Sequence, residues 1–123
     1  MLKTEKKFDL EDRTLIFAKQ IINFCKNLTN NTINFKLIDQ LIRSAGSIGA
    51  NYREANDSLG KKDFIHRLRI ARKESKETNY WLRVIADTNP SFRPRMKDLM
   101  QEGKEIVMIV SAIILSTKSK KKI

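Results

Sequence analysis

Four long segments of the chain repeat apolar residues every three or four positions, the spacing that gathers side chains on one face of an α-helix. They cover about residues 9–28, 33–58, 61–88 and 91–116. Short polar stretches rich in turn-forming residues separate them. Four glycines and two prolines are too few for a turn-rich β-sandwich or barrel. The pattern predicts an all-α protein whose short loops make neighbouring helices antiparallel, an up-down-up-down four-helix bundle.

Length and cysteine content fit one small domain in a reducing compartment. A chain of 123 residues can bury a core without disulfides or metal. We divide it into an N-terminal extension (1–8), the bundle (9–117) and a basic C-terminal tail (118–123). Cys25 is the single cysteine, and the N-terminus lacks the apolar run of a signal peptide. The longest apolar stretch, 106–115, is shorter than the roughly 20 residues that span a bilayer. We therefore expect a cytoplasmic protein with no membrane partner.

Each helix has an expected core face. In the first helix it consists of Leu15, Ala18, Ile22 and Cys25, widened by Phe17, Ile21, Phe24 and Leu28. In the second it consists of Leu37, Leu41, Ile48, Tyr52, Ala55 and Leu59. In the third it consists of Phe64, Leu68, Ala71, Ser75, Thr78, Leu82 and Ile85. We expect a single core that contains Leu41, Ile48, Leu68, Leu82, Leu99 and Ile106.

The middle of the second helix is a run of small residues, 44–50, that includes Gly46 and Gly49. A glycine inside a helix costs about 1 kcal/mol relative to alanine. One interpretation is that small residues let neighbouring backbones approach closely. The other is a break or kink at one of the glycines. The apolar register continues through the run, which favours close packing.

The last helix carries more apolar surface than a bundle can bury. We expect Ser91 to cap it, with Pro94 in its first turn. Its core positions alternate intervals of four and three in a heptad seam, which consists of Phe92, Met96, Leu99, Gly103, Ile106, Val110 and Ile113. Met108, Ile109 and Leu115 lie outside that seam. They predict a surface that contacts other molecules.

The sequence contains no recognisable catalytic or cofactor motif, and we expect no enzyme activity, cofactor or metal. Glu54, Glu74 and Glu77 lie on long helices, but the Glu-x-x-His motif of di-iron bundles is absent. Glu74 and Glu77 are expected to pair with nearby Arg or Lys side chains. His66 is expected on the surface and Cys25 in the core.

Positive charge is the strongest functional signal. The chain has 25 Lys plus Arg against 14 Asp plus Glu, a net charge of +11, which attracts polyanions. On the third helix, five cations fall within an arc of about 100° opposite the core face. This basic ridge consists of Arg69, Arg72, Lys73, Lys76 and Arg83. It is either a track for phosphates, helped by the tail lysines, or an ordinary solvated face.

Two aromatic residues follow the ridge. Tyr80 falls in the same arc and could stack on a base. Trp81 lies between the ridge and the core face, where packing between helices or subunits is the better explanation.

Two long motifs resemble a known family. They are residues 43–55 (RSAGSIGANYREA), and residues 63–65 (DFI) continuing through 68–78 (LRIARKESKET) to 81–82 (WL). Both resemble the four-helix-bundle family encoded in intervening sequences of bacterial 23S ribosomal RNA genes, and the accessory variability proteins of diversity-generating retroelements are similar. The resemblance implies homopentamers shaped as short barrels, with a basic outer surface for nucleic acid and a reverse transcriptase. It assigns packing to residues 44–50 and binding to residues 69–76, and implies no catalytic motif.

Two hypotheses remain open. The first is a homo-oligomeric, pentameric protein that binds RNA or DNA through backbone electrostatics without strong sequence specificity. The second is an assembly or adaptor protein that binds an acidic protein partner, such as a reverse transcriptase or another nucleic-acid enzyme.

Overall fold

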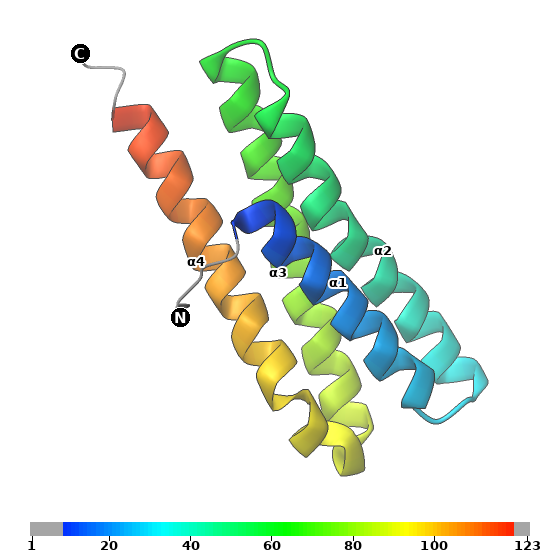
Figure 1. Ribbon diagram of the computed structural model, residues 1–123. Coiled ribbons are helices and arrows are strands. Elements are labelled where there is room, and N and C mark those ends of the chain that lie inside the picture. The colour runs from blue at the N-terminus through cyan, green and yellow to red at the C-terminus, as the bar shows by residue number, and fades with distance from the viewer. Residues whose placement is uncertain (1–8, 120–123) are drawn as a thin grey trace, which may run out of the picture.

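The chain forms a bundle of four helices with antiparallel neighbours, which confirms the expected fold class (Figure 1). The computed structural model describes residues 9–119, so the extension 1–8 and the tail lysines beyond Ser119 lie outside the described residues. The elements are α1 (Leu10–Asn27), α2 (Thr32–Asn56), α3 (Lys61–Thr88), a 3-10 segment η1 (Pro90–Met96) and α4 (Lys97–Ser119). None of the helices in this part of the chain is both long and apolar enough to cross a membrane.

Side-chain caps fix the starts of the first two helices. The Asp12 backbone N–H donates to the Asp9 carboxylate at 2.9 Å, so Asp9 caps α1. The Asn34 backbone N–H donates to the Asn31 side chain at 2.8 Å and starts α2 at Thr32. Each cap satisfies one of the backbone donors that the first turn of a helix leaves free.

The start of the last helix differs from the prediction. Ser91 does not cap it; instead, η1 begins after Asn89 and precedes α4. Pro90 begins η1 and Pro94 lies inside it. Proline supplies no backbone donor and crowds the preceding turn, so this stretch takes the tighter 3-10 form before regular helix begins. The Asn89 side chain also exchanges hydrogen bonds of 3.1 Å with Asn34, which ties this corner to α2.

The core is the one expected at its centre and differs on α1, at the end of α2 and where α3 begins beside the end of α4. There Phe64 and Ile113, which were expected in the core, are half-buried, whereas the neighbouring Ile65 and Ile114 are buried. All six residues assigned to a common core are buried: Leu41, Ile48, Leu68, Leu82, Leu99 and Ile106. On α1, however, Leu15 and Ile22 are 43% and 39% exposed. The buried face consists instead of Leu10, Thr14, Phe17, Ile21, Phe24 and Cys25. Leu59 is fully exposed because α2 ends at Asn56, before the chain reaches it.

The small-residue run brings α1 and α2 together at one glycine. Helix α2 is continuous from Thr32 to Asn56, so neither glycine breaks it. A Cβ on Gly49 would lie 3.0 Å from the Thr14 hydroxyl of α1, which confirms close packing there. A Cβ on Gly46 would meet nothing within 4 Å, and Gly46 is exposed. Packing within the chain does not explain Gly46.

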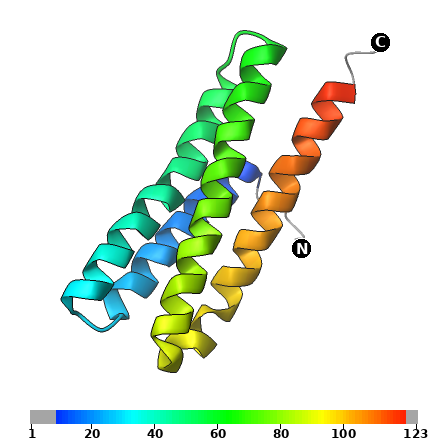
Figure 2. The ribbon, with the colours of Figure 1, turned by 180° about the vertical axis from the view of Figure 1, so that it is seen from behind.

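Helix α1 covers only part of the bundle. It has 18 residues against 28 in α3, and it starts some way short of the α2–α3 loop (Figures 1 and 2). The end of the molecule that carries the α2–α3 loop therefore consists of α2, α3 and α4. Here the first turns of α3 lie beside the last turns of α4.

Candidate nucleic-acid interface

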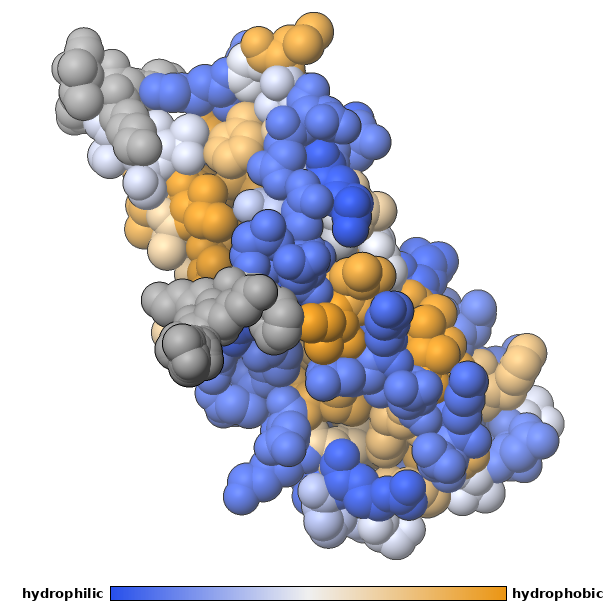
Figure 3. All heavy atoms as spheres, in the orientation of Figure 1, coloured by the Kyte–Doolittle hydropathy of each residue, from blue (hydrophilic) through white to orange (hydrophobic). Residues whose placement is uncertain are grey.

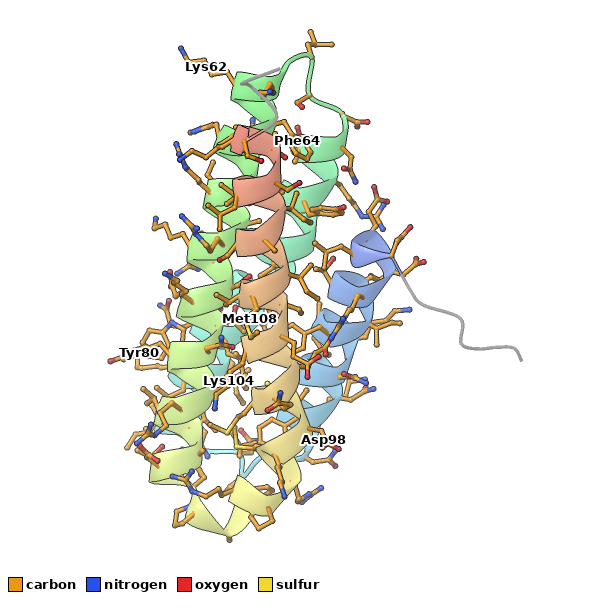
Figure 4. All side chains as sticks on the ribbon, turned by 90° about the vertical axis from the view of Figure 1, so that its left-hand side faces the viewer. Lys62, Phe64, Tyr80, Asp98, Lys104 and Met108 are labelled. Carbon is orange, nitrogen blue, oxygen red and sulfur yellow. The ribbon has the colours of Figure 1, made fainter. Side chains whose placement is uncertain are left out.

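The structure places the basic ridge along the outer side of α3. Arg69, Lys73, Lys76 and Arg83 are exposed. Figure 4 shows nitrogen-tipped side chains along this edge, with Lys62 near one end and Tyr80 further down. A helix that buries one stripe against its neighbours presents the opposite stripe to solvent, so the spacing of these residues produces the row.

Arg72 departs from the expected solvated ridge, because it is half-buried. It stands seven residues before Asn79, so both lie on the same side of α3. Asn79 is the residue that a Cβ on Gly103 of α4 would strike. Arg72 therefore lies on the flank of α3 that faces α4, and its charge is less accessible than those of Lys73 and Lys76.

The charge of Arg83 is partly neutralised. Its Nε atom lies 2.9 Å from Oδ2 of Asp87, one turn further along α3. The other oxygen of Asp87 is bound by Arg93 of η1. These side chains are exposed, so the pairs contribute little stability, but they place a carboxylate at this end of the ridge. Within residues 9–119, Arg69, Lys73 and Lys76 form no such ion pair.

The opposite end of the ridge opens into a pocket that the sequence did not predict. A cavity of about 590 Å³ lies between the first turns of α3 and the last turn of α4. We call it the end pocket, and its lining residues are Lys61, Lys62, Ile65, His66, Arg69 and Lys118. His66 is exposed, as predicted, and Arg69 belongs to both the pocket and the ridge. The ridge therefore continues into a cluster of cations contributed by two helices.

Helix α4 adds two further lysines, Lys104 beside α3 and Lys97 beside η1. Lys104 and Arg83 line a cavity of about 180 Å³. Lys104 and Lys97 also line one of about 530 Å³, together with Arg93 and Asp98. The sequence shows the cations of each helix but not which side of α4 meets α3, so these lysines were missed.

One signal in the sequence could have extended the ridge. Intervals of four and three residues connect Lys62, His66, Arg69, Lys73, Lys76, Tyr80 and Arg83. This spacing keeps all seven on one face of a helix. Lys62 and His66 could therefore have been assigned to the same surface.

The aromatic pair beside the ridge divides into an exposed and a packed residue. Tyr80 is 60% exposed, and its ring meets Trp81 edge to face with centroids 5.0 Å apart. Trp81 is half-buried against the core, which agrees with packing between helices. Its indole N–H lies 3.4 Å from a Glu77 oxygen. Tyr80 is thus the aromatic side chain that a ligand on the ridge would meet.

The glutamates of α3 do not form the expected ion pairs within the described residues. Glu77 faces the Trp81 indole, and one buried oxygen of Glu74 has no hydrogen-bond partner. Glu74 stands seven residues after Arg67, whose guanidinium donates to Asn51 of α2 at 3.5 Å, so Glu74 lies on the side of α3 that faces α2. Among residues 9–119, His, Cys, Asp and Glu form no group of three that could hold a metal ion. Cys25 is buried, and this burial raises the pKa of its thiol to about 11.

Comparisons with known proteins agree with the two sequence motifs. The family model of the 23S rRNA-intervening sequence protein matches residues 6–112. Among solved structures, the chain is similar to a Bacteroides thetaiotaomicron protein of unknown function from the S23 ribosomal protein family. That similarity has 38% identity and a TM-score of 0.77, and covers 85% of this chain and 96% of the other. No curated protein matches the sequence. The chain therefore belongs to the 23S rRNA-intervening sequence protein family.

Proposed function

We propose that this protein is a non-enzymatic, homo-oligomeric protein that binds RNA or DNA through the basic ridge of α3. The supporting observation is the row of exposed cations, Arg69, Lys73 and Lys76, which form no ion pair within residues 9–119. Positive side chains bind nucleic acid mainly by displacing counterions from its phosphates. Phosphate contacts carry no base information, so the protein discriminates little between sequences. Arg72 and Arg83 contribute less, since one is half-buried and the other faces Asp87.

Exposed apolar residues support the oligomer. On the outer side of α4, Met108 and Leu115 are 68% and 69% exposed. Leu15 and Ile22 of α1 and Phe35 of α2 are exposed as well. Figure 3 shows orange residues over the α1–α2 face and along α4, separated by hydrophilic ones. A closed ring needs two different patches on every protomer, and these two faces supply them. The number five rests on the family resemblance.

Assembly would strengthen weak binding. One protomer presents a short row of cations, whereas a ring repeats it. A polyanion that spans two or more copies binds each further site as an intramolecular event, which raises the overall affinity. The buried, single Cys25 fits a reducing compartment such as the cytoplasm.

The test is fluorescence anisotropy of labelled RNA and DNA at two salt concentrations. Affinity should fall steeply as salt rises, and it should change little with base sequence. Lys73→Glu combined with Lys76→Glu should remove binding, because it reverses two of the exposed charges of the ridge. Neither side chain is in the core, so the fold should be kept. The matched control is Lys19→Glu with Lys26→Glu, which makes the same charge change at exposed positions of α1. Equal loss in both double variants would show that net charge alone, and not the ridge, determines binding.

The exposed Tyr80 favours a second candidate function, an adaptor that binds an acidic protein. Tyrosine and arginine are enriched at protein–protein interfaces, and Tyr80 stands among the ridge cations. The partner could be a reverse transcriptase or another nucleic-acid enzyme. If the parent protein binds neither RNA nor DNA at low salt, this function replaces the first.

A further inference from the structure

The end pocket has a composition that distinguishes it from the rest of the α3–α4 surface. Lys61, Lys62, His66 and Arg69 reach it from α3, and Lys118 reaches it from α4. Ile65, which is 8% exposed, forms its apolar part. No carboxylate is among its lining residues. We propose that the end pocket binds the terminal phosphate monoester of a nucleic-acid strand whose backbone follows the ridge; this rests on the function proposed above.

Charge supports the choice of the end pocket over the other cavities. The cavity between η1 and α4 is lined by Asp98 as well as by cations. Arg83, which lines the middle cavity, is paired with Asp87. By contrast, the four Lys and Arg side chains of the end pocket form no ion pair within residues 9–119. Positive charge is therefore uncompensated at the end pocket, whereas Asp87 and Asp98 offset it at the other two cavities.

The chemistry of phosphate esters indicates a strand end. A phosphate monoester carries a charge of about −1.5 to −2 at pH 7 and three oxygens that accept hydrogen bonds. A diester inside a strand carries one negative charge. Donors that converge from two helices suit the group with more charge and more free oxygens. The single row of cations along α3 suits the diesters that follow it.

The position of the pocket connects it with the ridge. Arg69 lines the pocket and begins the row that continues through Lys73 and Lys76. Seven residues separate Arg69 from Lys76, about 10 Å along the helix axis. A strand anchored by its terminal phosphate would therefore pass these two lysines and reach Tyr80. The pocket sets the strand's direction, which backbone contacts alone would not do.

The experiment compares three RNA oligonucleotides of one sequence with the fluorophore at an internal position. One has hydroxyl groups at both ends, one a 5′-phosphate and one a 3′-phosphate. We expect one phosphorylated probe to bind the parent protein at least five times more tightly than the hydroxyl probe. Lys61→Gln with Lys62→Gln, and separately Lys118→Gln, should bring this ratio close to one. Lys97→Gln with Lys104→Gln is the matched control, and it should keep the ratio.

Three results would overturn the proposal. The first is equal binding of all three probes by the parent, which leaves the proposed function standing and removes the end pocket. The second is a ratio that persists in the pocket variants or disappears in the control. The third is displacement of the phosphorylated probe by a nucleoside 5′-monophosphate as readily as by an unlabelled phosphorylated strand, because the ligand would then be a small phosphate. If no probe binds at all, the proposed function itself is wrong.

Discussion

Gly46 and Gly49, three residues apart in α2, have opposite surroundings. Gly49 faces Thr14, whose hydroxyl is held by a 2.8 Å hydrogen bond to the Leu10 carbonyl and so has little room to move. Gly46 faces open space. Both lie inside the same helix, where alanine is favoured by about 1 kcal/mol. The difference between them is therefore steric.

We expect Gly46→Ala to raise the free energy of unfolding of the protomer by about 0.5–1 kcal/mol, because it adds only helix propensity. Gly49→Ala should lower it, since the new methyl group meets Thr14. Chemical denaturation of both variants at one protein concentration measures the two changes. A stabilising Gly49→Ala would show that α1 and α2 separate easily at this contact.

Gly103 of α4 is a stronger case of the same kind. A Cβ there would overlap with Oδ1 of Asn79 on α3. Gly103→Ala should therefore destabilise the protein, because the usual overpacking cost of about 1–3 kcal/mol outweighs the helix propensity that alanine adds. Adding Asn79→Ala should recover most of this loss, because the obstructing atom is removed. A double-mutant cycle measured by urea unfolding gives the coupling, and additive effects of the two changes would contradict the contact.

At the scale of whole elements, one ion cluster joins α1 to α4. The Arg13 guanidinium binds Glu102 at 2.7 Å and Glu105 at 2.6 Å. Its pKa is raised chiefly by the hydrogen bond to Glu102, so it stays charged. The pKa of Glu105 is lowered from its ordinary value of 4.5 by the Gln101 amide, which donates at 3.0 Å, and by Arg13.

This cluster predicts acid sensitivity. A carboxylate whose pKa is lower in the folded state stabilises the fold above its ordinary pKa. That contribution is lost as pH falls below 4.5 and through the folded-state pKa. The melting temperature of Glu105→Gln should therefore fall less between pH 6 and pH 3 than that of the parent. Glu54→Gln is the control: Glu54 is exposed and forms no ion pair within residues 9–119, so its pH dependence should match the parent's.

The helices could be predicted because the spacing of apolar residues within each segment is enough to indicate a helix. The periodicity of apolar residues predicted all four helices and the six common core residues. The errors arose where a neighbouring element determines which residues of a helix are buried or where the helix begins. Leu15 and Ile22 form as good a stripe as Phe17 and Ile21, and only the positions of α2 and α4 determine which stripe is buried. Two prolines likewise converted the first turns of the last helix into η1.

The ridge could be predicted from the sequence because it lies on one helix, whereas the end pocket could not because two helices form it. Four of the five ridge cations are exposed on α3 as their spacing indicated. The end pocket needs Lys118 from α4 beside Lys61 and Lys62 from α3, and that juxtaposition exists only after folding. Asp87 pairs with Arg83 on its own helix and also with Arg93, a contact between α3 and η1 that spacing does not reveal.

At the scale of the whole molecule, the outer side of α4 is the feature that the bundle leaves unexplained. Figure 4 shows Met108 on the side of α4 turned away from the other helices. Met108 and Leu115 stand seven residues apart, so they share that side, and both are about two-thirds exposed. Ile109, by contrast, packs against the core. A helix surface of this kind is typical of a contact between subunits.

We expect light scattering of the parent protein at micromolar concentration to report a homo-oligomer, with a pentamer as the expected size. Met108→Ser with Leu115→Ser should shift it toward the monomer while helicity is kept, because neither side chain is in the core. The matched control is Leu59→Ser, which removes an equally exposed leucine at the α2–α3 loop and should leave the mass unchanged. The monomeric variant should also bind RNA more weakly, since each strand then meets one ridge instead of several. A parent that stays monomeric would contradict the assembly, and an unchanged mass in the double variant would exclude this side of α4 as the interface. A stable dimer or tetramer would keep the apolar contact and refute the pentamer.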